Sequence, residues 1–194
     1  MLEFQELSTG EEDRVRWRAL IESLPESLQD IHYTPEYQRV YEQTYGYNIF
    51  LLVCQIDDNT LIQVVVRRPL AEPVLSEKSA GHFDLESVYG FGGPLSLNPL
   101  SEEVALQYAK AFSEYNLRQG AITEFCVLHP LLQTEQIACL PIALERFVRK
   151  YCVYLDLSEP YHILWKNIEE RQRKAIAVAR RKGLRVRKVQ LNNL

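Results

Sequence analysis

Cysteine is scarce in this 194-residue chain and is not spaced for metal binding or cross-linking. The four cysteines, Cys54, Cys126, Cys139 and Cys152, form no Cys-x-x-Cys pair, and each lies among apolar neighbours. Disulfide frameworks and zinc sites are typically marked by close, regular cysteine spacing. The pattern therefore favours buried thiols in a reducing compartment, and it predicts neither disulfides nor zinc.

Long hydrophobic runs and a leader-like start are also missing. The chain opens on Met-Leu-Glu-Phe-Gln-Glu, without the basic region and the apolar run of a secretory signal. No window approaches the roughly 20 apolar residues that a membrane helix needs. We therefore expect a cytoplasmic protein without a membrane span. A hydrophobic content of 46% over 194 residues is enough to build a core.

Histidine and serine lack the contexts of two common kinds of active site. His32, His82 and His162 show no metal-ligand spacing with one another or with the cysteines, so no metal site is predicted. A nucleophile elbow is missing around three serines, Ser79, Ser87 and Ser96. The sequence therefore carries no signal of a serine hydrolase.

Glycine is sparse as well, but three of the eight glycines fall within four residues, at positions 90, 92 and 93, and Pro94 follows directly. Glycine allows positive φ and close approach of a backbone to a ligand or another backbone, and proline stiffens the turn. The pattern matches neither a P-loop nor a dinucleotide fingerprint. A tight structural turn between the aromatic rings of Tyr89 and Phe91 is the alternative to a binding loop.

Acidic residues outnumber basic ones, and the net charge is −4, but the charge is unevenly distributed. Residues 169–188 hold nine Lys or Arg and two Asp or Glu, whereas the remainder holds 13 and 24. A basic segment on an acidic body indicates an anionic partner at that end. Phosphates of a substrate, a merely solvated helix face, and nucleic acid are the three interpretations. We expect no direct DNA binding, because the body is acidic and aromatics do not interleave the basic segment.

Strands are predicted where apolar residues alternate with polar ones or run continuously. They are residues 2–7, 48–56, 60–67, 83–88, 121–128, 143–148 and 151–157, with a further strand beginning at 184. The segments 48–56 and 60–67, joined by Asp57-Asp58-Asn59, are expected to form an antiparallel hairpin covered on both faces. Residues 69–81 are expected to form a loop.

Helices are predicted at residues 11–24, 35–45, 101–119 and 134–139, and from 161 to 182. Thr34 is the expected N-cap of the second helix, and Gly46, Gly120 and Gly183 are the expected stops. In the last helix an apolar stripe is predicted from Ile168, Ala175, Ile176 and Ala179. The opposite face is expected to carry Arg173, Lys174, Arg180 and Arg181.

Two polar residues near the predicted strand 121–128 are candidates for chemistry. Glu124 lies in the middle of that strand, where a charge is costly unless it is paired or serves a site. Its carboxylate could bind a substrate amine or take its proton, and an edge-strand charge facing water or an arginine is the alternative. His129 could act as a base near neutral pH, or it could be a turn residue bonded to backbone before Pro130.

Four motifs in order resemble those of Fem-type, GNAT-like acyltransferases. They are Asp30-Ile31-His32-Tyr33-Thr34-Pro35-Glu36-Tyr37, Tyr89-Gly90-Phe91-Gly92-Gly93-Pro94, Glu124-Phe125-Cys126-Val127-Leu128-His129-Pro130-Leu131, and the basic segment 171–184. Together they span about 160 residues. The chain departs from the family pattern at Val127, where an arginine is expected, and it lacks the pyrophosphate loop of ordinary acetyl-CoA-binding GNAT enzymes.

The resemblance implies an α/β (α+β) GNAT-like fold, a mixed central sheet flanked by helices. Residues 1–157 would form a first GNAT-like module, and residues 158–194 a basic connecting helix and the start of a second, in a chain that is either truncated or naturally half-length. The implied reaction is transfer of an acyl or aminoacyl group to an amine of a peptidoglycan or glycan precursor, during cell wall biogenesis. The implied donors are acyl-CoA or aminoacyl-tRNA, with no tightly bound cofactor and no metal.

By the same resemblance, Glu124 would be the catalytic residue that orients the nucleophile. The substrate-binding residues would be Tyr89, Phe91, Gly92, Gly93, His129, Arg171, Arg173 and Lys174, with the basic ones holding phosphates. A homodimer, or a partner chain that supplies the second module, is expected. The alternative function is a non-catalytic module that binds an anionic precursor or a partner chain. The central expectation is that the turn at residues 90–94 opens a crevice beside the sheet and that the basic helix faces it.

Overall fold

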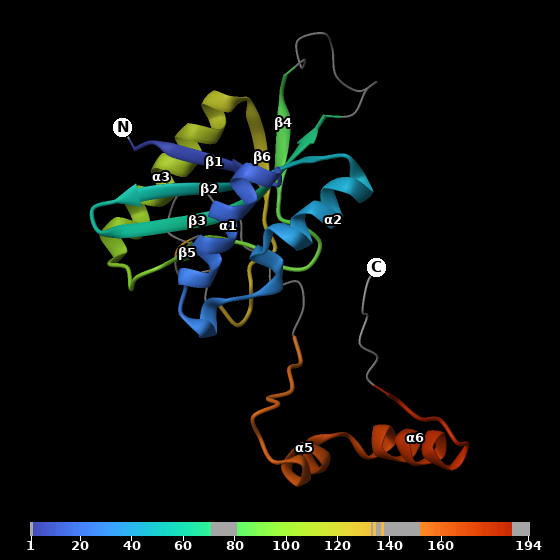
Figure 1. Ribbon diagram of the computed structural model, residues 1–194. Helices are drawn as coiled ribbons and strands as arrows, with labels where there is room; N and C mark the ends of the chain where they lie inside the picture. The colour runs from blue at the N-terminus through green and yellow to red at the C-terminus, as the bar shows by residue number, and fades with distance from the viewer. Residues whose placement is uncertain (1, 71–80, 133, 135–136, 138–151, 188–194) are drawn as a thin grey trace. The chain divides into compact units, whose positions relative to one another are not determined.

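The described residues fall into two units. The computed structural model describes residues 2–70, 81–132, 134, 137 and 152–187 (Figure 1). The units are Met1–Arg146 and Phe147–Leu194. The domain boundary predicted after residue 157 therefore lies inside the second unit. In the described part of the chain, no helix combines the length and the apolar character that spanning a bilayer requires.

The first unit is built on a mixed sheet. Its strands are β1 (Phe4–Ser8), β2 (Asn48–Ile56), β3 (Asn59–Pro69), β4 (Phe83–Glu86), β5 (Leu95–Ser96) and β6 (Ala121–Phe125). The order along the sheet is β1-β2-β3-β4-β6, and β5 pairs with β3. Neighbours are antiparallel except β4 and β6, which run parallel. The predicted mixed α/β class with a mixed sheet is thus confirmed.

The central hairpin β2–β3 forms as predicted. Asp57 and Asp58 make the turn, with Asp57 at φ 51°, and Ile56 pairs with Asn59. A short polar side chain such as aspartate tolerates this left-handed conformation. The side chains of β3 alternate between two cores, because successive residues of a strand point to opposite faces. Leu61 packs in one core and Ile62 in the other, so the hairpin is covered on both sides.

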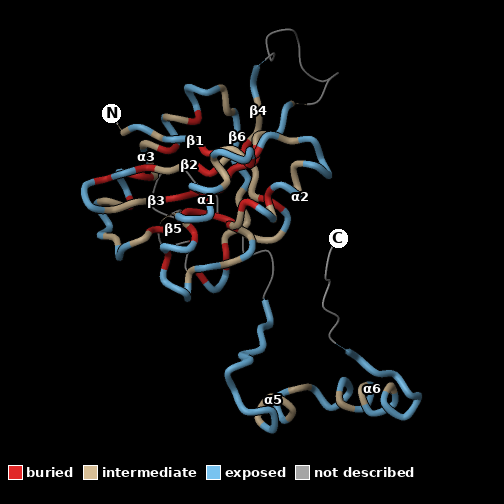
Figure 2. The backbone as a smooth tube through the Cα atoms, in the orientation of Figure 1, coloured by how far each residue is buried: buried red, intermediate tan, exposed pale blue. Residues whose placement is uncertain are grey.

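Helices cover the two faces of the sheet (Figure 1). On one face lie α1 (Glu11–Ser23), the short 3-10 helices η1 (Glu26–Leu28) and η2 (Ile31–Tyr33), and α2 (Pro35–Tyr45). On the other lies α3 (Glu102–Gln119). Trp17 and Tyr33 are fully buried in the first core, and Tyr108 is buried in the second. Figure 2 shows the buried residues concentrated along the strands between these layers.

The predicted helix ends are confirmed for α2 and α3. The Thr34 hydroxyl accepts the N–H of Tyr37, and Gly46 ends α2 in the left-handed conformation. The Ser101 hydroxyl caps α3 in the same way, and Gly120 ends it at φ 99°. A Cβ on Gly120 would also lie 2.9 Å from the Gly81 carbonyl oxygen, so glycine is required there for both conformation and space.

Within residues 152–187, the second unit contains two helices where the sequence predicts one. They are α5 (Tyr161–Asn167) and α6 (Glu170–Arg181), separated by a break at residues 168–169. Gly183 follows α6 at φ 79°, as predicted. The strand predicted over 151–157 is wrong for residues 152–157, which are irregular.

Some predicted elements are shorter than expected or fall outside the described residues. β6 ends at Phe125 rather than at residue 128, and β4 ends at Glu86 rather than at residue 88. Residues 184–187 are irregular where a strand was expected to begin. The predicted strand 143–148, and most of the predicted loop 69–81 and helix 134–139, lie outside the described residues.

Candidate functional site

The glycine loop, residues 88–93, lies at the carboxyl ends of the parallel strands β4 and β6. The Ser87 amide donates to the Phe125 carbonyl at 3.1 Å, after which the loop leaves the ladder. Gly92 rejoins it: its amide donates to the Val127 carbonyl at 2.8 Å, and its carbonyl accepts the His129 amide at 3.0 Å. Ligands of open α/β sheets bind beyond the carboxyl ends of the strands, so the loop has a position suited to binding.

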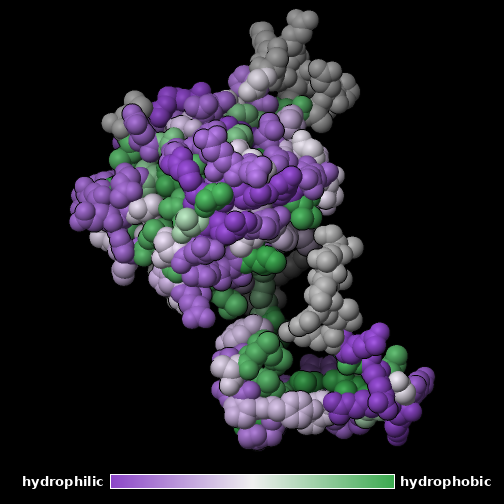
Figure 3. All heavy atoms as spheres, viewed as in Figure 1, coloured by the Kyte–Doolittle hydropathy of each residue, from purple (hydrophilic) through white to green (hydrophobic). Residues whose placement is uncertain are grey.

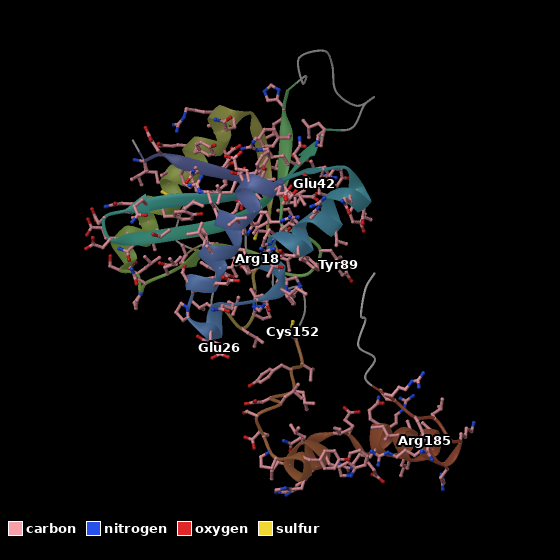
Figure 4. All side chains as sticks on the ribbon, in the orientation of Figure 1. Arg18, Glu26, Glu42, Tyr89, Cys152 and Arg185 are labelled. Carbon is pink, nitrogen blue, oxygen red and sulfur yellow. The ribbon has the colours of Figure 1, made fainter. Side chains whose placement is uncertain are left out.

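Two tyrosines hold this loop against the helical layer. The buried Tyr33 hydroxyl donates to the Gly93 carbonyl at 3.1 Å, and the Tyr37 hydroxyl donates to the Tyr89 carbonyl at 2.7 Å. The Tyr89 side chain itself is 80% exposed and stands at the surface (Figure 4). The aromatic ring of Phe91, by contrast, packs against the ring of His129 at a centroid distance of 5.1 Å.

The glycines of the loop are packed against the protein's own side chains. A Cβ on Gly92 would lie 2.8 Å from the Cβ of Ser87, and one on Gly93 would lie 2.8 Å from the Cβ of Thr134. Both distances are too short for real Cβ contacts, so only glycine fits. The space beside Gly92 and Gly93 is therefore filled by protein. This packing favours the interpretation of these two residues as a structural turn.

Glu124 ends a chain of polar groups that reaches into the second core. The Tyr108 hydroxyl donates to Oε1 of Gln63 at 3.1 Å, and Nε2 of Gln63 donates to Oε1 of Glu124 at 3.1 Å. Glu124 as a whole residue is exposed in the described part of the chain, whereas its carboxyl group contacts the buried Gln63. Desolvation of the carboxyl group raises the pKa of Glu124, and the hydrogen bond from Gln63 offsets this increase only in part.

Asp30, His32 and His129 form a cluster that the sequence spacing does not reveal. Oδ1 of Asp30 lies 2.6 Å from Nδ1 of His32, and Oδ2 lies 3.5 Å from Nε2 of His129. The Phe91 ring packs edge-on to both imidazoles. One potential ligand atom from each of the three residues lies within 4.8 Å of the others. No metal site was predicted at these residues.

The protonation of the cluster follows from its hydrogen bonds. Asp30 accepts the backbone amide of His32 as well as its Nδ1. Desolvation opposes ionisation of Asp30, but these hydrogen bonds and the two imidazoles outweigh it, so the pKa of Asp30 is lowered. Burial lowers the pKa of His129, which is therefore neutral near pH 7. An anionic carboxylate thus faces two imidazoles.

The predicted phosphate-binding residues lie in the second unit. Nη1 of Arg173 donates to three carbonyls at the end of α5, those of Trp165, Lys166 and Ile168, at 3.3, 2.9 and 2.5 Å. Arg173 is thus half-buried against α5, and its role in phosphate binding remains a prediction. The Lys174 ammonium pairs with Glu170 at 2.7 Å.

The remaining basic residues of α6 differ in their surroundings. The guanidinium of Arg180 lies 5.8 Å from the Trp165 ring centroid, in cation–π contact with α5. Arg171 and Arg181 are exposed, and hydrophilic side chains gather over α6 in Figure 3. Phosphate binding by Arg171 remains a prediction. Because the two units are described separately, the expected meeting of this helix with the glycine loop remains a prediction.

Among the predicted site residues, the structure brings together Phe91, Gly92, Gly93 and His129. It adds Asp30 and His32, which were not among the predicted site residues. The sequence does contain one local signal for them, because an aspartate two residues before a histidine can accept that residue's backbone amide. Comparison of the chain with known protein families, curated proteins and solved structures gave no match.

Proposed function

We propose that this chain carries an N-acyl or aminoacyl transfer domain that acts on an amine of a cell-envelope precursor. The donor is an acyl thioester or an aminoacyl ester, such as acyl-CoA or charged tRNA, and the acceptor belongs to a peptidoglycan or glycan precursor. Four motifs that resemble those of Fem-type transferases support the reaction class. The observation that carries the proposal is the glycine loop, bonded through Gly92 to the segment after β6 at the carboxyl ends of two parallel strands.

In this proposal Glu124 binds and orients the attacking amine. The side-chain amide of Gln63 donates to its carboxyl group and holds its orientation. The exposed ring of Tyr89 contacts the substrate, and exposed arginines such as Arg171 pair with phosphate oxygens of the donor. A mixed sheet flanked by helices is compatible with the GNAT-like fold that the motifs imply. Both donors are cytoplasmic compounds, so the cytoplasm is the proposed location.

Turnover by the purified chain tests this proposal. The chain is mixed with acyl-CoA or aminoacyl-tRNA and with an amine-bearing peptidoglycan precursor, and the amide product is measured by mass spectrometry. Glu124→Gln is expected to reduce product formation about 10- to 100-fold, because the amine loses its anionic partner and its orientation. Glu114→Gln removes an exposed carboxylate of α3 and serves as the matched control.

A binding measurement distinguishes a chain that does not bind the donors from one that binds them but turns over slowly. Amide signals of residues 88–93 in NMR spectra are expected to shift when coenzyme A thioester or charged tRNA is added. Absence of product together with unchanged loop signals for both donors would overturn the proposal.

A non-catalytic module that binds an anionic precursor is the second candidate, and the exposed arginines of α6, Arg171 and Arg181, favour it. Gly92 and Gly93 lie against Ser87 and Thr134, so these glycines serve a backbone turn and leave no space for a ligand there. This candidate predicts that an anionic precursor shifts the spectra of the chain while no donor is consumed. Product formation by the wild-type chain excludes it.

A further inference from the structure

One face of α6 carries a row of exposed cations. The half-buried residues of α6 share the opposite face, which the bonds of the Arg173 guanidinium hold against the end of α5; they are Arg173, Ile176 and Ala179. The exposed row recurs at intervals of three or four positions, and its members are Arg171, Lys174, Val178 and Arg181. Within the second unit, α6 therefore presents three cations and one apolar side chain in line.

The charge around this row is of one sign. Residues 171–187 contain eight Lys or Arg and no Asp or Glu. The acidic residue of α6, Glu170, pairs with Lys174 at 2.7 Å. No ion pair among the described residues involves Arg181, Lys182 or Arg185, and all three are exposed. Their charges therefore attract an anion without first having to leave an acidic partner in this part of the chain.

The end of α6 places apolar side chains beside these cations. The Gly183 amide donates to the Arg180 carbonyl at 3.0 Å, and the Leu184 amide donates to the Ala179 carbonyl at 3.1 Å. With Gly183 at φ 79°, these two bonds form a Schellman motif, which fixes the direction in which the chain leaves the helix. Leu184 is 68% exposed and Val186 is fully exposed, and they alternate with two arginines. An anion that pairs with those arginines thus lies beside exposed apolar side chains.

A bilayer of anionic phospholipids and a nucleic acid are both large anions, and the residues among the cations distinguish them. Residues 170–187 contain no aromatic side chain on which a nucleobase could stack. They contain Val178, Leu184 and Val186, which are exposed. A membrane interface buries such apolar groups while its headgroup phosphates pair with lysine and arginine. The combination therefore favours an anionic lipid surface over RNA or DNA.

We propose that the exposed row of α6 and residues 182–187 form a lipid-docking face, which binds the anionic surface of a phospholipid bilayer. The cations contact headgroup phosphates, and Val178, Leu184 and Val186 enter the boundary between headgroups and acyl chains. Docking needs neither the donor nor the acceptor of the proposed acyl transfer. The lipid-docking face therefore goes beyond that reaction and can be tested without it.

Co-sedimentation with vesicles measures docking. The wild-type chain is expected to sediment with phosphatidylcholine vesicles that contain about one-third phosphatidylglycerol, and to stay in solution with phosphatidylcholine alone. Each cation at an anionic surface raises the affinity about fivefold, so the triple variant Arg181→Gln, Lys182→Gln, Arg185→Gln is expected to bind at least about 30-fold more weakly. This variant leaves Arg171 and Lys174, which were predicted to hold phosphates, in place.

The matched control removes three exposed cations of the first unit, with the substitutions Arg39→Gln, Lys110→Gln and Arg118→Gln. It changes the net charge by the same amount, and its vesicle affinity is expected to stay within about threefold of the wild type. Equal losses in the two triple variants would show that net charge alone attracts the chain to vesicles, which overturns the lipid-docking face.

The double variant Leu184→Ser, Val186→Ser tests the apolar contribution at constant charge. Its vesicle affinity is expected to fall at least about tenfold, because interfacial binding grows with the apolar area that is buried. An unchanged affinity overturns lipid docking, and so does a wild-type chain that fails to sediment with the anionic vesicles. Binding to a short RNA duplex without vesicle binding would assign the face to nucleic acid instead. If the wild-type chain docks on vesicles but makes no amide, the proposed acyl transfer fails and lipid docking stands.

Discussion

Tyr33 donates its fully buried hydroxyl to the carbonyl oxygen of Gly93 at 3.1 Å. Tyr33 belongs to the 3-10 helix η2, which also carries His32. The Tyr33 carbonyl in turn accepts the indole N–H of Trp17 at 2.8 Å. One three-residue helix therefore connects the core beneath α1, the imidazole cluster and the glycine loop.

The Tyr33 hydroxyl can be removed with little change of shape. In Tyr33→Phe the Gly93 carbonyl loses its donor at a buried position, so we expect a loss of about 1–3 kcal/mol in the free energy of unfolding. Urea denaturation measures this. Tyr89→Phe makes the same chemical change on an exposed ring and is expected to cost less than about 0.5 kcal/mol. Equal stabilities of the two variants would contradict the importance of the Tyr33 bond.

Gly92 is expected to be intolerant of even one added carbon. In Gly92→Ala the new Cβ would meet the Cβ of Ser87, and overpacking of this kind costs about 1–3 kcal/mol. Ser87→Gly removes the opposing atom but also the hydroxyl that accepts the Val127 amide. The double variant is therefore expected to be more stable than the sum of the two single losses predicts, by at least about 0.5 kcal/mol in urea denaturation. Strict additivity would show that the two positions do not contact each other.

Ionisation of Glu124 is expected to oppose folding. Its folded pKa is raised above the ordinary 4.5, so the folded state binds the proton more tightly than the unfolded state does. The contribution is fully present below pH 4.5 and is lost as the pH rises through the folded pKa. Glu124→Gln cannot ionise, so its stability relative to the wild type should increase over this range. Parallel stability curves from pH 4 to 8, like those expected for Glu114→Gln, would contradict the desolvation of this carboxyl.

The helix ends and the hairpin could be predicted because their causes are local. Thr34, Pro35 and Gly46 specify α2 within a dozen residues, and an apolar run on each side of Asp57-Asp58 specifies β2 and β3. The imidazole cluster could not be predicted, since it joins two residues near position 30 to one near position 130. Only the sheet order, which places the segment after β6 beside the glycine loop, brings them together.

The end of β6 could not be predicted from the sequence for a similar reason. Residues after Phe125 retain strand-like composition, but their hydrogen bonds go to the Ser87 side chain and to Gly92 instead of a regular ladder. The interruption is caused by a loop more than 30 residues earlier in the chain. A local sequence pattern therefore cannot predict where β6 ends.

Arg173 illustrates how a break in a helix changes the role of a side chain. A continuous helix would place it beside Lys174 on a solvated face, whereas the turn at residues 168–169 directs its guanidinium to the free carbonyls of α5. We expect Arg173→Ala to destabilise the helix pair by about 1–2 kcal/mol, because hydrogen bonds from a charged donor are lost. Hydrogen exchange of the α5 and α6 amides should accelerate about 5- to 30-fold.

Lys174→Ala is the matched control for this variant. It removes a neighbouring basic residue whose exposed pair with Glu170 contributes about 0.3–0.5 kcal/mol. Its exchange rates should stay within about threefold of wild type. Equal acceleration in both variants would show that Arg173 does not cap α5.

The parallel pairing of β4 with β6 also dictates an order of events during synthesis. The glycine loop leaves the ribosome well before residues 127–129, and the whole of α3 is made in between. Contacts that close such long segments form slowly, because the chain entropy is lost before the contact is gained. In a nascent chain, Gly92 therefore lacks its final backbone partners until α3 has been made, and the glycine loop reaches its native shape only when the segment after β6 docks.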